Sequence, residues 1–225
     1  MMKKYTCILF DLDGTLTHSH PGIYACFRYA LEKMGQPEPT EAQLRLCVGP
    51  TLMYSFQTYF GFSEEDAKRA TELYRERYAI KGIWENTPIE GAIDTLKALK
   101  DAGYKLAMAT SKPIYFAKQI SEKFGFSQYF DAEVGSGMDE HTLPTKASVI
   151  AEAMRLLDAS KEECLMVGDR KHDAEGAKEN AVDCALLRVG YAENEEEFVS
   201  SAPKYVFEDL RKLKEFLLDA SSASL

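Results

Sequence analysis

Short apolar segments rich in strand-forming residues alternate with segments of helical periodicity along most of the chain. The apolar segments predict buried strands at residues 5–10, 105–109, 132–134, 164–167 and 184–187. The segments between and after them predict helices near residues 93–99, 115–124, 146–157, 173–180 and 210–218. Strands and helices that alternate at this spacing are typical of a parallel sheet with right-handed crossover connections. We therefore expect an α/β fold.

A block without a predicted strand separates the first two strands. Its apolar residues recur at helical spacing and predict helices at residues 22–34, 41–46, 52–60 and 63–79. The last of these begins with Ser63 and Asp66, which resemble an N-terminal capping signal. We therefore expect two domains, a core made of residues 1–17 and 86–225 and a helical insertion at residues 18–85.

The composition excludes several classes of partner. The chain has 36 acidic and 27 basic residues, and its net charge of −9 argues against nucleic-acid binding. It has no apolar run near the ~18 residues of a membrane span, and residues 1–4 do not resemble a signal peptide, so we expect a cytoplasmic protein without membrane partners. The five cysteines are scattered and form no C-x-x-C, which argues against a disulfide framework or a zinc site.

Polar residues follow several of the predicted strands. In an open parallel sheet, ligands bind beyond the carboxyl ends of the strands. The polar residues expected at that edge are Asp11, Asp13, Thr110, Ser111, Lys146, Asp169 and Asp173. Four carboxyl groups gathered at one edge repel one another unless a cation lies between them. Oxygen ligands without His or Cys favour Mg²⁺, and the four histidines lack the spacing of metal ligands.

This set of residues suits phosphoryl transfer. Mg²⁺ would neutralise a phosphoryl dianion that the net charge of the protein repels. Lys146 would supply a second positive centre, and Lys112 and Lys171 are the alternatives for that role. Asp11 and Asp13 can face the same crevice, so that one carboxylate attacks phosphorus while the other handles the proton of the leaving oxygen.

The same residues also have purely structural interpretations. Thr110 and Ser111 could cap the next helix. Lys146 could be a solvated lysine at the start of a helix, and Asp173 an ordinary acid in a first helical turn.

Four segments occur in the order of a known family. They are Asp11-Leu12-Asp13-Gly14-Thr15-Leu16, Ala109-Thr110-Ser111-Lys112-Pro113, Lys146 and Val167-Gly168-Asp169-Arg170-Lys171-His172-Asp173. With them the chain resembles the haloacid dehalogenase superfamily, specifically the phosphoglycolate-phosphatase-like phosphatases with a helical cap. The resemblance covers nearly the whole chain and implies a Rossmann-like parallel-sheet core with an inserted α-helical cap domain.

The resemblance also implies the catalytic roles. Asp11 is expected to be the nucleophile and Asp13 the general acid/base. Thr110 is expected to hydrogen-bond the phosphate, and Lys146 to hold both the phosphate and the nucleophile.

The same resemblance implies the ligands of Mg²⁺ and further phosphate contacts. Asp11, Asp13 through its main-chain carbonyl, and Asp169 are expected to bind the metal. Asp173 is expected to act through a metal-bound water or by orienting Lys146. The main-chain N–H groups expected to bind phosphate are those of Leu12, Asp13 and Ser111.

The resemblance further implies that the helical insertion is a mobile cap that excludes water during phosphoryl transfer. Its hinges are expected near residues 17–19 and 86–89. The family more often has Asp at the position of His18.

These expectations combine into a Mg²⁺-dependent phosphatase that hydrolyses a small phosphomonoester, phosphoglycolate-like or a nucleoside 5′-monophosphate, through an aspartyl-phosphate on Asp11. A sugar phosphomutase of the same fold and a non-catalytic protein that binds a phosphate ligand are the alternatives. A dehalogenase has no need for an acid/base at Asp13 or for a magnesium cluster. We expect a monomer or a homodimer.

Overall fold

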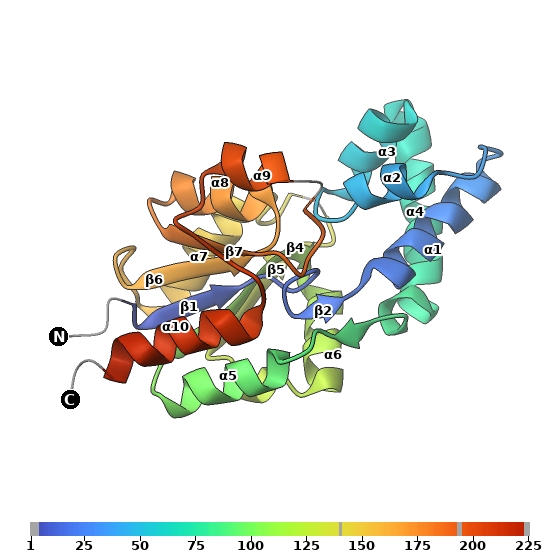
Figure 1. The fold of residues 1–225 in the computed structure, drawn as a ribbon. Helices are drawn as coiled ribbons and strands as arrows, with labels where there is room; N and C mark the ends of the chain where they lie inside the picture. The colour runs from blue at the N-terminus through green and yellow to red at the C-terminus, as the bar shows by residue number, and fades with distance from the viewer. Residues whose placement is uncertain (1–4, 140, 193–194, 223–225) are drawn as a thin grey trace. The chain divides into compact units, whose positions relative to one another are not determined.

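The computed structural model describes residues 5–139, 141–192 and 195–222 (Figure 1). Residues 1–4, where no signal peptide was expected, lie outside this part. The chain divides into two compact units, one formed by the described parts of Met1–Thr17 and Pro88–Leu225 and the other by His18–Thr87. The chain passes between them at β2 (Thr17–His18) and β3 (Thr87–Pro88), which pair as a two-stranded sheet.

The first unit contains a sheet of six strands among the residues described. The strands are β1 (Cys7–Phe10), β4 (Lys105–Pro113), β5 (Ala132–Ser136), β6 (Cys164–Gly168), β7 (Asp183–Leu187) and β8 (Tyr205–Phe207). They lie in the order β5-β4-β1-β6-β7-β8, and every neighbouring pair is parallel. The α/β prediction is thus confirmed. Strand β8 was missed, because three residues at a sheet edge are too short to show an apolar pattern.

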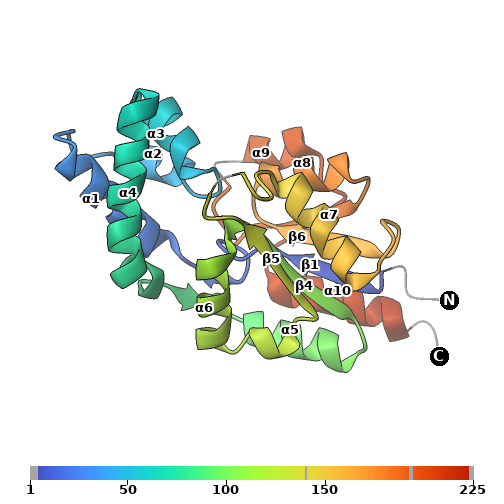
Figure 2. The same ribbon diagram turned by 180° about the vertical axis from the view of Figure 1, so that it is seen from behind.

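Helices cover both faces of this sheet. Figures 1 and 2 show α5 (Ala92–Asp101) and α10 (Leu210–Ser222) on one face, and α7 (Lys146–Leu157) and α8 (Lys171–Glu179) on the other. The unit also contains α6 (Ile114–Phe124), the 3₁₀ turn η2 (Ser127–Tyr129) and α9 (Glu195–Ser201).

Strand β1 is buried on both faces, which explains its uninterrupted apolar sequence. Cys7 and Leu9 pack in one cluster with Val149 and Ile150 of α7. The alternation of side chains along a strand places Ile8 and Phe10 on the opposite face. The acidic segment after Phe10 is therefore held at the carboxyl edge of the sheet.

The second unit is helical. It consists of α1 (His20–Lys33), α2 (Glu41–Leu46), α3 (Leu52–Phe60), α4 (Glu64–Ile80) and the 3₁₀ turn η1 (Gly82–Trp84). The ring of Phe27 lies 5.0 Å, centroid to centroid, from the rings of both Phe56 and Tyr74, which joins three helices in one aromatic core. The predicted cap at Ser63 is confirmed, because its Oγ accepts a hydrogen bond of 3.1 Å from the main-chain N–H of Asp66.

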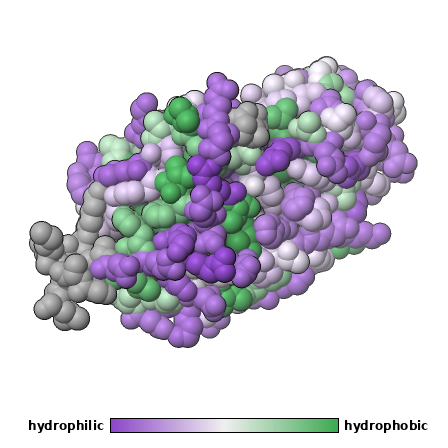
Figure 3. Space-filling view, viewed as in Figure 1, coloured by the Kyte–Doolittle hydropathy of each residue, from purple (hydrophilic) through white to green (hydrophobic). Residues whose placement is uncertain are grey.

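The surface in Figure 3 is mostly hydrophilic, with small groups of hydrophobic residues between polar side chains. Among the residues described, no helix combines the length and the apolar composition that crossing a membrane requires. The five cysteines are buried free thiols.

Candidate active site

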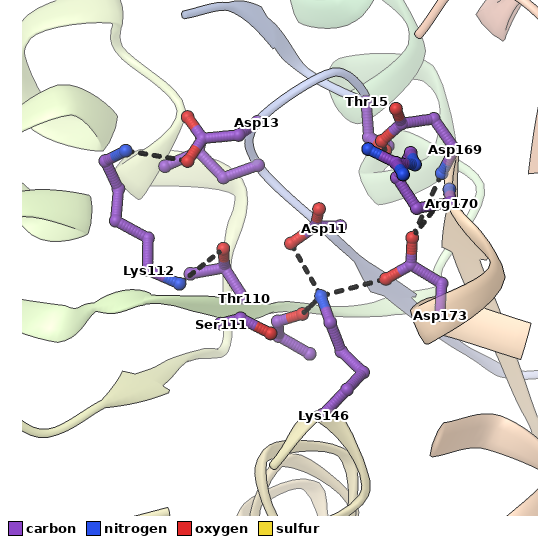
Figure 4. Close-up of polar contacts among 12 residues, drawn as sticks. Asp11, Asp13, Thr15, Thr110, Ser111, Lys112, Lys146, Asp169, Arg170 and Asp173 are labelled. Atoms are coloured by element: carbon purple, nitrogen blue, oxygen red, sulfur yellow. Dashed lines mark hydrogen bonds and ion pairs between the residues drawn. The ribbon is translucent and has the colours of Figure 1, made fainter. Parts of the chain in front are cut away.

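The carboxyl edge of the sheet gathers the polar residues predicted from the sequence (Figure 4). Asp11 follows β1, Thr110 and Ser111 lie in the last part of β4, and Asp169 follows β6. Lys146 is the first residue of α7, and Asp173 lies in the first turn of α8. Residues far apart in the sequence meet because parallel strands bring their carboxyl ends to one edge.

Lys146 lies between two of the aspartates. Its Nζ donates hydrogen bonds to Asp11 Oδ1 at 2.7 Å and to the carbonyl of Ala109 at 3.2 Å, and it forms an ion pair with Asp173 Oδ1 at 2.8 Å. Lys146 is only 8% exposed, so its interpretation as a solvated lysine is wrong. The structure thus places Lys146 directly on Asp11.

Burial and neighbouring charges shift the pKa values of Asp11 and Lys146. Burial raises the pKa of Asp11 from 3.8 to about 6; Lys146 opposes the shift, and Asp173 adds to it. Burial disfavours the charged form of Lys146, but Asp11 and Asp173 outweigh this effect and raise the pKa of the ammonium. Lys146 therefore stays charged beside Asp11.

Asp169 is fully buried and held by two loops. Its Oδ1 accepts a hydrogen bond from Thr15 Oγ1 at 3.1 Å, and its Oδ2 accepts one from the main-chain N–H of Tyr191 at 2.6 Å. A Cβ atom at Gly14 or Gly190 would overlap the Asp169 side chain. Gly14 also has φ +90°, which favours glycine.

Three carboxylates form a group suited to a metal ion. One oxygen each from Asp11, Asp169 and Asp173 lie within 4.8 Å of one another. Burial raises the pKa of Asp169 well above its usual value, and repulsion from Asp173 and Asp11 adds to the shift. A hard divalent cation among these oxygens would relieve both the repulsion and the loss of solvation, so the group fits Mg²⁺.

Asp173 and Asp13 lie differently with respect to this carboxylate group. Asp173 Oδ2 accepts hydrogen bonds of 3.1 Å from the main-chain N–H groups of Asp169 and Arg170, so Asp173 both caps α8 and lies within the carboxylate group. The Asp13 carboxylate lies outside that group and pairs instead with Lys112. Its expected metal contact concerned the main-chain carbonyl and not this side chain.

The loop after β1 turns sharply. The carbonyl of Leu12 accepts hydrogen bonds from the main-chain N–H groups of Thr15, Leu16 and Thr17. Among the described residues, the N–H groups of Leu12 and Asp13 donate to no main-chain carbonyl, so both are available to an anionic ligand.

Thr110 lies beside this loop and does not cap a helix. It is 1% exposed, and its Oγ1 accepts a hydrogen bond of 3.2 Å from the main-chain N–H of Lys112. Helix α6 begins after Pro113, without a side-chain cap. The capping interpretation of Thr110 is therefore wrong.

Thr15, Gly190 and Tyr191 were given no role at the site from the sequence, and Lys112 was considered only as an alternative to Lys146. Residues 190 and 191 could have been found, because they lie just beyond the predicted strand at residues 184–187. A buried ion pair of 2.8 Å, also not predicted, joins Arg170 to Glu197, whose Oε1 accepts the N–H of Lys171 as well. No local pattern marks Glu197, because it lies in α9 while its partner Arg170 directly precedes α8.

Comparisons with known proteins extend over both units. Residues 8–187 match the family model described as haloacid dehalogenase-like hydrolase. The chain is 38% identical to a 5′-nucleotidase of Pseudomonas aeruginosa, over 95% of this chain and 96% of that protein. It is 31% identical to a phosphoglycolate phosphatase of Vibrio parahaemolyticus, over 92% and 94% of the two chains. The crystal structure of a predicted phosphatase from Clostridium acetobutylicum matches with a TM-score of 0.90 and 39% identity, over 96% and 99%.

Proposed function

The chain belongs to the haloacid dehalogenase-like hydrolase family, as its motifs predicted, and from this premise we propose that it is a Mg²⁺-dependent phosphatase that works through an aspartyl-phosphate on Asp11. Two relatives that match it over nearly their whole length are a 5′-nucleotidase and a phosphoglycolate phosphatase, and the chain is a phosphoric monoester hydrolase. The observation that carries the proposal is the position of Asp11, buried beside Lys146 and within 4.8 Å of carboxylate oxygens of Asp169 and Asp173.

The first half-reaction transfers the phosphoryl group to Asp11. Lys146 holds Asp11 Oδ1, which leaves Oδ2 to attack phosphorus. The bond between phosphorus and the leaving oxygen breaks, and Asp13 donates a proton to that oxygen.

The second half-reaction restores Asp11. Asp13, now a carboxylate, takes a proton from a water molecule whose oxygen attacks phosphorus. The bond between phosphorus and Asp11 breaks, and inorganic phosphate leaves.

The other residues of the site bind the phosphoryl group, balance its charge or position the residues that do so. The N–H groups of Leu12, Asp13 and Ser111 and the hydroxyl of Thr110 would bind the phosphoryl oxygens, and Lys146 would neutralise them. When bound by Asp11, Asp169 and the carbonyl of Asp13, Mg²⁺ would stabilise the charge of the phosphoryl group. Asp173 would hold Lys146 in position.

We propose a nucleoside 5′-monophosphate as the first substrate to test and a phosphoglycolate-like ester as the second. The similarity to a 5′-nucleotidase at 38% identity supports the first, and the similarity to a phosphoglycolate phosphatase at 31% supports the second. The helical unit His18–Thr87 would act as the cap that excludes water during transfer.

The test is phosphate release from a panel of nucleoside 5′-monophosphates, phosphoglycolate, pyrophosphate and p-nitrophenyl phosphate, with Mg²⁺ and with a chelator. We expect Mg²⁺-dependent release that Asp11→Asn lowers by roughly three orders of magnitude or more, because the amide cannot attack phosphorus. Asp101→Asn, which alters an exposed carboxylate on α5, is the matched control and should leave the rate unchanged.

Two outcomes would contradict the proposal. Release that Asp11→Asn does not lower would exclude Asp11 as the nucleophile. No release from any ester by the wild type would favour the alternatives, and movement of the phosphoryl group between positions of a sugar phosphate would identify a phosphomutase.

A further inference from the structure

Lys112 contacts the carboxylate of Asp13 at the catalytic edge. Its Nζ donates a hydrogen bond of 2.6 Å to Asp13 Oδ2 (Figure 4). The lysine side chain is 7% exposed and that of Asp13 is 13% exposed, so the ion pair is largely shielded from solvent. The two neighbouring aspartates thus have separate lysine partners, Lys146 for Asp11 and Lys112 for Asp13.

The other oxygen of the same carboxylate has no partner. Among the described residues, none forms a hydrogen bond with Asp13 Oδ1, although this atom is buried. Buried carboxylate oxygens in native proteins normally accept hydrogen bonds, and an exception calls for an explanation. Proton exchange with a substrate would explain it.

An irregularity in β4 places Lys112 for this contact. Thr110 and Pro113 pair with the consecutive residues Gly135 and Ser136 of β5, so Ser111 and Lys112 bulge out of the ladder. A Cβ atom at Gly135 would overlap the carbonyl of Lys112, and the main-chain N–H of Lys112 donates to Thr110 Oγ1. The backbone of Lys112 is therefore held from two sides, as is expected of a bulge that re-aims a side chain near an active site.

We infer that Lys112 is the positioning residue for the general acid/base: it holds Asp13 by Oδ2 and so leaves Oδ1 as the oxygen that exchanges the proton. This inference rests on the proposed function. As the bond between phosphorus and the leaving oxygen breaks, the proton passes from Oδ1 to that oxygen, and the lysine keeps its own protons. In the second half-reaction, Oδ1 takes a proton from the attacking water.

The basicity of the leaving group separates this role from a structural one. An alkoxide is a strong base and needs a proton as it leaves, whereas p-nitrophenolate leaves without one. The value of kcat/KM reports the steps up to the transfer of the phosphoryl group to Asp11, so it is sensitive to the acid in that transfer.

The experiment compares kcat/KM of the wild type, Lys112→Met and Lys112→Arg on p-nitrophenyl phosphate and on the alkyl phosphate that the wild type hydrolyses best. For Lys112→Met we expect a loss of about 100-fold on the alkyl phosphate, the lower end of what general acid catalysis contributes, and a loss of only a few-fold on p-nitrophenyl phosphate. Lys112→Arg should restore most of the lost activity. Lys97→Met, which removes an exposed ion pair on α5, should match the wild type on both substrates.

A second comparison covers the case in which Lys112→Met does not fold. Lys112→Gln keeps a polar side chain of similar length and should show the same difference between the two substrates. In an Asp13→Asn background, the change at Lys112 should cause no further loss, because the group that it positions is gone.

Each contrary result overturns the inference. Equal losses on both substrates would assign Lys112 to phosphate binding or to folding, and a higher KM with unchanged kcat would assign it to substrate binding. No loss would show that Asp13 needs no partner. A wild type without phosphate release would instead overturn the proposed function, and this inference with it.

Discussion

The main-chain N–H of Tyr191 donates a hydrogen bond to Asp169 Oδ2 over 2.6 Å and so ties the loop after β7 to the loop after β6. Gly190 makes this contact possible, because a Cβ atom there would overlap the Asp169 side chain. Thr15 holds the other carboxylate oxygen from the loop after β1. Two loops thus orient one proposed metal ligand that lies in a third loop.

Gly190→Ala should therefore weaken Mg²⁺ binding. The added methyl group would displace Asp169, and we expect the Mg²⁺ concentration for half-maximal activity to rise about 10- to 100-fold, the usual effect of disturbing groups that orient metal ligands. Measuring phosphatase activity at increasing Mg²⁺ concentrations gives this half-maximal concentration for each variant.

Gly35→Ala is the matched control for this substitution. Gly35 has φ +70°, and no atom would contact the new Cβ, so the variant should lose some stability through backbone strain alone. Its Mg²⁺ dependence should stay that of the wild type. An unchanged Mg²⁺ dependence in Gly190→Ala would refute the role of Asp169 as a metal ligand held by this loop.

Lys146→Met should destabilise the metal-free protein. It would leave Asp11 and Asp173 buried without their cation, and removing one partner of a buried ion pair lowers the free energy of unfolding by about 3–5 kcal/mol. Urea denaturation in the presence of a chelator measures the difference.

Lys97→Met breaks an exposed ion pair and should change the free energy of unfolding by less than about 1 kcal/mol. Equal effects of the two substitutions would mean that the Lys146 cluster contributes nothing beyond a surface pair.

Mg²⁺ should stabilise the protein more at pH 7.5 than at pH 5. Burial raises the pKa of Asp11 from 3.8 to about 6, so its protonated form favours the folded state. This contribution is fully present below about pH 4 and is lost as the pH rises through about 6. Mg²⁺ binds the deprotonated carboxylates, so protons compete with it at low pH.

Thermal denaturation with Mg²⁺ and with a chelator at the two pH values measures this effect. At pH 7.5 and a Mg²⁺ concentration 100 times Kd, the expected gain is about 2.7 kcal/mol. Asp169→Asn should reduce the gain at pH 7.5. A gain that is equal at both pH values would exclude binding through the carboxylates with raised pKa.

Much of the fold could be predicted because it depends on local patterns. The predicted bounds of α2, α3 and α7 match the structure, since helix periodicity is a local pattern within each segment. The central strands were found because strands buried on both faces are uninterrupted apolar runs. The end of β4 was placed four residues too early, since Thr110, Ser111, Lys112 and Pro113 lack that apolar pattern.

The sequence by itself determined the parallel α/β fold and the polar residues at the ends of the strands, because both follow from the spacing of residue types along the chain. Only the tertiary structure decided which charges meet. It placed Lys146 between Asp11 and Asp173, Lys112 on Asp13, and the N–H of Tyr191 on Asp169. These contacts join residues from separate strands and loops, and they depend on sheet register, on a bulge and on close approaches at glycine that no local pattern encodes.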